Sequence, residues 1–140
     1  MFSRLFPLVL MTVSLLLGCG KTAPPPVDRT AIEDVAGWRQ LYIASHGRKP
    51  PADEAAFLDF VEAKMKERGQ EFDRAKFLVS PRDGQKYVVQ YGKELATLGA
   101  DSVVVHEKEG YGGKILVAYQ MGRSAEIDAA ELPTLLPSKP

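Results

Sequence analysis

The chain has 140 residues, in which 18 Lys and Arg residues balance 18 Asp and Glu residues, and 45 % of the residues are hydrophobic. This composition is typical of a single globular domain and excludes a disordered or strongly charged chain. Because balanced charge creates no field that would attract phosphate groups, we expect no nucleic acid partner.

Residues 1–19 have the layout of an export signal. A single cation, Arg4, precedes an apolar stretch over residues 5–17, and Gly18 and Cys19 follow. An apolar helix of about 14 residues would span about 21 Å, whereas the hydrocarbon core of a bilayer is about 30 Å thick. We therefore expect this segment to be removed and not to remain as a transmembrane anchor.

The cleavage region, Leu16-Leu17-Gly18-Cys19, resembles the lipobox of bacterial lipoproteins, with a leucine three positions before the cysteine and a small residue directly before it. The resemblance implies cleavage between Gly18 and Cys19 and acylation of Cys19, which would anchor the mature chain to a membrane. Gly20, in place of an aspartate after the cysteine, favours the outer membrane. Since Cys19 is the sole cysteine, no internal disulfide can form.

The sequence divides into four segments. We expect a signal peptide over residues 1–18, a lipidated cysteine and proline-rich tether over 19–29, one globular domain over 30–136 and a short tail over 137–140. The three consecutive prolines of the tether favour a partly stiff polyproline conformation that lifts the domain off the bilayer.

Two amphipathic helices are predicted at the start of the domain. The first covers residues 31–45, begins at a capping box formed by Thr30 and Glu33, and buries a stripe of Ile32, Val35, Trp38, Leu41 and Tyr42. The second is capped by Asp53, ends at Gly69, and buries a stripe of Phe57, Phe60, Val61 and Met65. The two helices are expected to pack as a hairpin and to need a further layer over their apolar sides.

An alternating pattern replaces the helical one in the second half of the chain. It predicts strands along Tyr87-Val89-Tyr91, Val103-Val104-Val105 and Ile115-Val117-Tyr119-Met121, with a short last strand over residues 125–127. Asp128 and Glu131 form a second capping box, for a last helical turn that Pro133 breaks. The predicted fold class is α+β: a two-helix hairpin, then an antiparallel meander of three to four strands and a short C-terminal helix.

The region from Ser80 to Leu136 resembles small uncharacterised bacterial lipoproteins whose carboxyl half is similar to the β-meander of type II secretion pseudopilins. The resemblance is carried by Ser80-Pro81-Arg82-Asp83-Gly84, Tyr87-Val88-Val89-Gln90-Tyr91-Gly92, Val117-Ala118-Tyr119, Gly122-Arg123 and Glu131-Leu132. Two features depart from the pseudopilin pattern: Met121-Gly122-Arg123 replaces an Asp-Gly-His turn, and the lipobox replaces the prepilin leader. The family implies no catalytic activity.

Few residues suggest chemistry. The two histidines, His46 and His106, lie in no ligand-spaced cluster, so we expect no metal and no cofactor. His46 is expected at the end of the first helix and His106 at the surface or at a strand edge. Ser80, Asp83 and His106 could form a hydrolase triad, but no Gly-x-Ser-x-Gly elbow surrounds Ser80, which is more simply a turn serine.

Tyr111 is the candidate contact residue. It lies in a glycine-rich turn, where an exposed aromatic ring can anchor a protein partner, and the simpler alternative is a ring folded onto its own strand. The sequence therefore predicts a membrane-anchored lipoprotein that acts as a non-enzymatic binding or scaffolding module of the cell envelope. The alternatives are an accessory component of a secretion or pseudopilus system and a small extracytoplasmic hydrolase that uses His106.

Overall fold

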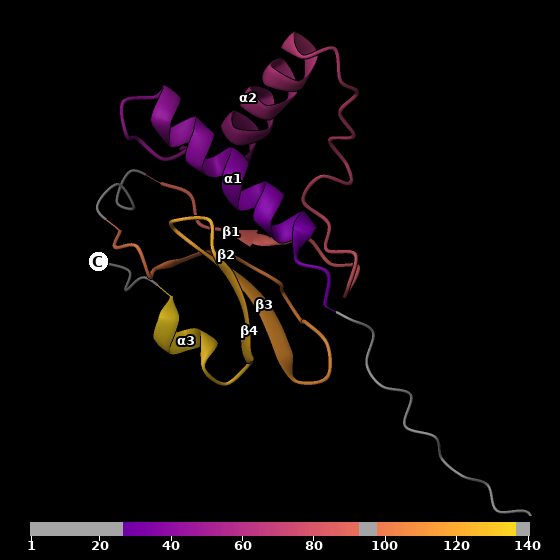
Figure 1. The fold of residues 1–140 in the computed structure, drawn as a ribbon, viewed down its shortest axis with the longest axis vertical. Coiled ribbons are helices and arrows are strands. Elements are labelled where there is room, and N and C mark those ends of the chain that lie inside the picture. Colours follow the sequence, from indigo (N-terminus) through magenta and orange to yellow (C-terminus); the bar gives the residue numbers. More distant parts are fainter. Residues whose placement is uncertain (1–26, 93–97, 137–140) are drawn as a thin grey trace, which may run out of the picture.

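The computed structural model describes residues 27–92 and 98–136. The elements follow one another as α1 (Thr30–Ser45), α2 (Glu54–Glu67), β1 (Val88–Val89), β2 (Val103–His106), β3 (Lys114–Tyr119), β4 (Ser124–Asp128) and α3 (Leu132–Leu135) (Figure 1). The predicted α+β class is therefore confirmed. The expected signal peptide and lipidation site, Gly18 and Cys19, lie outside the described residues. None of the helices in the described part of the chain is long and apolar enough to span a bilayer.

The four strands form one antiparallel sheet in the order β1-β2-β3-β4, as expected of a meander. The register between β2 and β3 contains a β-bulge: Val103 pairs with Tyr119, whereas Val105 pairs with the next residue along, Ala118. The extra residue in β2 is Val104. Because a bulge places two neighbouring side chains on one face, Val104 and Val105 both pack into the core that faces α1.

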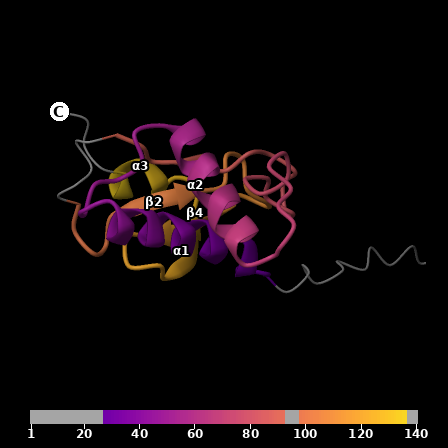
Figure 2. The same ribbon diagram turned by 90° about the horizontal axis from the view of Figure 1, so that it is seen from above.

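Both faces of the sheet are covered. On one face, α1 packs through Ile32, Val35 and Ala36 against Leu116 and Ala118. On the opposite face, Leu132, Leu135 and Leu136 of the C-terminal segment cover Val103, Ile115 and Val117. Figure 1 shows α1 and α3 on opposite sides of the strands, and Figure 2 shows α1 and α2 lying over the sheet from above.

This two-sided burial corrects the expected strand pattern. Ile115 and Val117 face α3, not the two N-terminal helices, whereas Leu116 and Ala118 face α1, so the run from Ile115 to Ala118 is buried throughout. Continuous apolar runs are typical of strands that are covered on both faces. Met121 is not part of this pattern, because β3 ends at Tyr119 and Met121 lies in the following turn with 73 % of its surface exposed.

The predicted start of the first helix is correct, but its predicted cap is wrong. Arg29 occupies the cap position without a side-chain bond, and Asp28 Oδ1 accepts a hydrogen bond from the Thr30 N–H. The Glu33 carboxylate instead accepts a hydrogen bond from the Ser124 hydroxyl on β4. Glu33 therefore binds Ser124, a residue distant in the sequence, and does not form the predicted capping box with Thr30.

The second helix begins and ends as predicted. The Asp53 side chain accepts a hydrogen bond from the Ala56 N–H at 2.8 Å, and Gly69 takes a positive φ of 68° just after the last turn. Phe60 of α2 packs edge-on against Trp38 and Tyr42 of α1, with ring centroids 6.5 and 5.1 Å apart. The two helices therefore pack against each other through aromatic rings, in agreement with the predicted helix hairpin.

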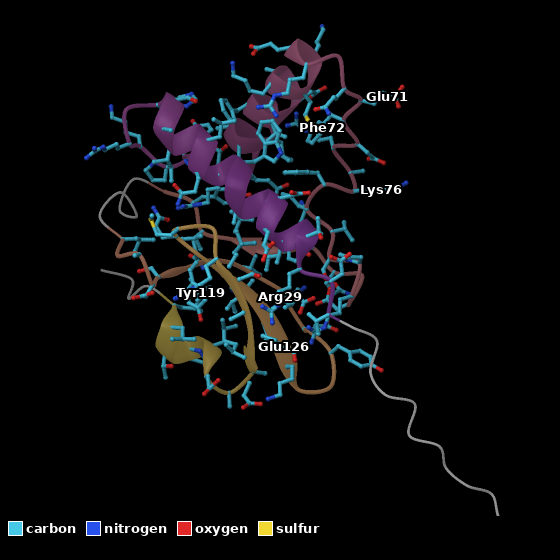
Figure 3. The ribbon with its side chains drawn as sticks, viewed as in Figure 1. Arg29, Glu71, Phe72, Lys76, Tyr119 and Glu126 are labelled. Atoms are coloured by element: carbon cyan, nitrogen blue, oxygen red, sulfur yellow. The ribbon has the colours of Figure 1, made fainter. Side chains whose placement is uncertain are left out.

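The segment that follows α2 returns to the sheet without forming a helix or strand. In Figure 3, Phe72 lies toward α2, whereas Glu71 and Lys76 point away from the molecule. Phe72 and Phe77 have ring centroids 5.2 Å apart, and both pack against the core beneath α1. This segment therefore extends the aromatic core to the turn that begins at Ser80.

The end of the domain differs from the prediction in one respect. The Asp128 N–H donates to the Glu131 carboxylate at 3.2 Å, which is one half of the expected capping box. Pro133 does not break the helix, because it lies in the first turn of α3, where the missing N–H has no helical partner to lose.

Candidate functional site

The turn between Ser80 and Gly84 lies against the β2–β3 hairpin, and Arg82 joins the two. Its Nη1 contacts the Glu126 carboxylate of β4 at 2.5 Å. Its Nη2 donates to the backbone carbonyl oxygens of Tyr111 and Lys114, at 3.2 and 3.1 Å. Glu126 lies on the strands beside this hairpin (Figure 3). One guanidinium therefore joins the turn from Ser80 to Gly84 to both β4 and the tip of the β2–β3 hairpin.

Behind Arg82 lies a carboxylate that is completely buried. Glu107 is 0 % exposed, and its oxygens accept hydrogen bonds from the Ser80 hydroxyl at 2.9 Å and from the Leu116 N–H at 2.8 Å. The Arg82 Nε atom lies 3.8 Å from Glu107 Oε2. A buried carboxylate is tolerated only when it is paired and hydrogen-bonded, and Glu107 is both.

Asp83 makes a second attachment of the same turn. Its carboxylate accepts hydrogen bonds from three backbone N–H groups, those of Gln85, Glu109 and Gly110. Partial burial opposes ionisation of Asp83, but these donors outweigh it and hold its pKa below the ordinary value. The negative charge of Asp83 therefore ties the turn to the base of the hairpin.

The hairpin itself is closed by a tight turn. Tyr111 and Lys114 exchange two backbone hydrogen bonds, and Gly112 and Gly113 between them have φ of 61° and 78°. Two consecutive residues with positive φ are the signature of a type I′ turn, which strongly favours glycine. Gly110 is fixed for another reason, because a Cβ at that position would lie 2.1 Å from the Lys114 carbonyl oxygen.

These contacts present the predicted contact residue on a fixed support. Tyr111 is 57 % exposed, and its backbone oxygen accepts hydrogen bonds from the Lys114 N–H and from Arg82. Its ring is therefore displayed to solvent while its backbone is held on two sides. An aromatic side chain with little conformational freedom to lose is well suited to be a binding anchor.

The predicted triad residues are not arranged for catalysis. The Ser80 hydroxyl donates to Glu107, and Ser80 is fully buried. His106 is also buried, which corrects the expected surface position, and its Nδ1 donates to the Glu107 carbonyl oxygen at 2.6 Å. No side-chain hydrogen bond joins Ser80 and His106 in the described part of the chain. Each group therefore takes part in holding the fold.

His46 and Glu54 make contacts that stabilise the two N-terminal helices. His46 follows the last turn of α1, where its Nδ1 lies 2.8 Å from the Tyr42 carbonyl oxygen and its ring stacks on Tyr42 at 3.9 Å. Glu54, in the first turn of α2, pairs with Lys86 at 2.6 Å. Within residues 27–92 and 98–136, no three His, Cys, Asp or Glu side chains are grouped as a metal site would require.

Comparison with known proteins adds no assignment. The chain matches no family model, no curated protein and no solved structure. Any functional conclusion must therefore be drawn from the residues themselves.

Sequence reasoning missed a second buried charge, Arg39 of α1. Arg39 is 0 % exposed; its Nε donates to the Gln90 carbonyl oxygen at 3.2 Å and its Nη1 to the Gln120 side chain at 2.7 Å. Its Nη2 and the nearby Tyr91 hydroxyl have no partner among the described residues. Burial lowers the pKa of Arg39 to about 10, so it remains charged at neutral pH.

The signal for Arg39 was present in the helical period. Arg39 follows Ile32 by seven residues and Val35 by four, so it continues the buried stripe of α1. Leu41, which was expected in that stripe, is 36 % exposed. Because arginine side chains are mostly exposed in proteins, the helical period alone does not predict that Arg39 is buried.

Proposed function

We propose that this protein is a membrane-anchored lipoprotein whose folded domain is a non-enzymatic binding or scaffolding module of the cell envelope. The observation that carries the binding role is the exposed ring of Tyr111 on a hairpin whose backbone is held by Arg82. The lipobox ending in Cys19 supports the anchoring role. Acyl chains contribute about 0.8 kcal/mol for each buried methylene, so two or more chains hold a protein stably at a bilayer.

The geometry around the turn supports a binding role over a hydrolytic one. A serine nucleophile needs a base within hydrogen-bond reach and access to substrate. Ser80 is fully buried and donates to a carboxylate that already accepts a second hydrogen bond. The polar side chains of this turn therefore hold the hairpin in place, and the hairpin in turn exposes the ring of Tyr111 to solvent.

The experiment is crosslinking in intact membranes followed by capture of the protein. The full chain is expected to capture a reproducible protein partner, and Tyr111→Ala is expected to lose it without loss of folding. Met121→Ala is the matched control, because Met121 is also exposed and lies in the next hairpin, at the opposite end of β3. Equal capture by both variants, or no partner at all, would contradict the binding role.

The anchoring role has a separate test. Mass spectrometry of the protein purified from membranes is expected to show a chain that begins at Cys19 and carries a diacylglyceryl thioether. An intact Met1, or a free thiol at position 19, would contradict it.

A second candidate function is an accessory role in a secretion or pseudopilus system. It is favoured by the antiparallel order β1-β2-β3-β4, which is the meander that the pseudopilin resemblance implies. Deletion of the gene is then expected to change the set of exported proteins, and an unchanged set would remove this candidate.

A further inference from the structure

The hairpin that carries Tyr111 lies at the end of the domain where the described chain begins. Figure 1 shows the described chain beginning at the end of the sheet where the β2–β3 hairpin projects, and Figure 2 shows it beginning at the end of the molecule that holds the segment between α2 and β1. Burial raises the pKa of Tyr87 to about 12, and the negative charges of Asp83 and Asp28 add to this shift. Asp28 therefore lies close to the turn that Arg82 joins to the hairpin.

The part of the tether between this end and Cys19 is short. Val27, the first described residue, is the eighth residue after Cys19. Eight residues span at most about 28 Å when fully extended, and about 25 Å in the polyproline conformation that consecutive prolines favour. A folded domain of about 110 residues has a radius of gyration of about 13 Å, which corresponds to a body about 34 Å across. The tether is therefore shorter than the domain is wide.

This length restricts how a lipid-anchored domain can face the bilayer. When acyl chains hold Cys19 at the lipid headgroups, Val27 stays within about 28 Å of the bilayer surface. A domain about 34 Å across cannot turn its Val27 end fully outward without lifting Val27 beyond that reach. The β2–β3 hairpin is therefore held toward the bilayer, and the β3–β4 turn with Met121, at the opposite end of β3, is held away from it.

The charges around Tyr111 favour a protein over lipid headgroups as the contact of its ring. Two exposed residues before the turn, Lys108 and Glu109, carry opposite charges. Lys114, after the turn, pairs with Asp128 at 2.6 Å. Recognition of anionic lipid typically uses a cluster of about four or more Lys and Arg side chains, and residues 107–114 contain two. A protein pocket that encloses the ring is the partner that this hairpin fits best.

We propose that the partner bound through Tyr111 is a protein of the same membrane that holds Cys19, with a pocket for the ring close to the bilayer surface. This inference rests on the proposed function and specifies where the partner lies. The contacts of Arg82 present the ring on a fixed hairpin, and the short tether keeps that hairpin near the bilayer. The gap beneath it, at most about 28 Å, is too narrow for a free globular domain of similar size, whereas a protein bound to the bilayer already occupies this layer.

Energy transfer in lipid vesicles tests the orientation. The lipidated full chain is reconstituted with a donor dye attached to Tyr111→Cys or, as the matched control, to Met121→Cys, and an acceptor dye is placed in the lipid headgroups. The Cys19 sulfur, as a thioether, does not react with the dye. The six residues of β3 separate the two positions by about 20 Å. We expect the label at position 111 to lie about 10–20 Å closer to the bilayer than the label at position 121. Equal distances, or the reverse order, would overturn the proposal.

Exchange of the membrane tests the partner. Gly20→Asp introduces the aspartate whose absence favours the outer membrane, so it is expected to hold the same domain at the inner membrane, which fractionation of the two membranes verifies. Gly20→Ser is the matched control. After crosslinking in intact cells, the wild-type chain and Gly20→Ser should capture the same membrane protein, and capture by Gly20→Asp should fall to background. Capture of a soluble protein, a crosslink to lipid alone, or unchanged capture by the relocated Gly20→Asp chain would overturn the proposal.

Tyr111→Ala separates this inference from the proposed function. If Tyr111→Ala loses a partner that is soluble, the proposed function stands and the location inferred for its partner is wrong. If the wild-type chain captures no partner at all, the proposed function fails and this inference fails with it.

Discussion

The contacts of Arg82 predict a large loss of stability on its removal. In Arg82→Met, Glu107 would stay fully buried without its cation, and Glu126 and two backbone carbonyl groups would lose a donor. Removing one partner of a buried ion pair typically costs 3–5 kcal/mol. Since Glu107 keeps the hydrogen bonds from Ser80 and Leu116, we expect the lower end of that range, about 3 kcal/mol.

The assay is urea unfolding followed by the fluorescence of Trp38, the sole tryptophan of the chain. The matched control is Arg123→Met, because the Arg123 side chain pairs with Asp101 at 2.9 Å on the surface, where both are mostly exposed. Exposed pairs contribute at most about 1 kcal/mol. If the two substitutions lowered the free energy of unfolding by the same amount, the assignment of Arg82 as the residue that holds the hairpin would be refuted.

Three further predictions concern single positions. Gly110→Ala should lower the free energy of unfolding by about 3 kcal/mol, because its Cβ would clash with the Lys114 carbonyl oxygen. Gly112→Ala should lower it by only about 1–2 kcal/mol, because only the left-handed backbone is strained, and equal urea midpoints for the two variants would contradict this. Burial raises the pKa of Tyr87 from 10.0 to about 12, so its contribution to stability is complete below pH 10 and is lost as the pH rises through 12. Urea unfolding at alkaline pH should therefore show a loss of about 2–3 kcal/mol in the free energy of unfolding, and Tyr87→Phe should not show this loss. Arg39→Met should raise the free energy of unfolding by about 1 kcal/mol, because it removes a buried charge that no described carboxylate neutralises. A lower free energy of unfolding in the urea measurement would contradict this and would show that the charge is stabilised by a partner.

The sequence predicted the elements well because their signals are local. Helix periods, the Asp53 cap, the glycine after α2 and the alternating strands each depend on residues only a few positions apart. The buried polar groups were missed because their partners are distant. Arg82 and Glu107 are 25 positions apart, and the Arg39 side chain reaches Gln90 and Gln120, which are 51 and 81 positions away. No local pattern records such a pairing.

The candidate site was predictable only in part. Tyr111 was identified from its glycine-rich turn, which is a local signal. The prediction that Ser80 is a turn serine is confirmed, because Ser80 begins the turn that ends at Gly84, but no local pattern predicts the buried Glu107 carboxylate that accepts its hydrogen bond. His106 and Glu107 directly follow the valine run of β2 and are buried with it, whereas the sequence predicts His106 at the surface or at a strand edge because it is ionisable.

The two-sided core has a consequence for biosynthesis. The face of the sheet made by Val103, Ile115 and Val117 is covered by Leu132, Leu135 and Leu136, which follow every strand of the sheet in the chain. During synthesis the strands therefore leave the ribosome before the residues that cover this face, and until those residues emerge the face stays open to solvent. A chain exported as we propose would cross a membrane unfolded, and a core that needs the segment after its last strand delays folding in a way that suits such export.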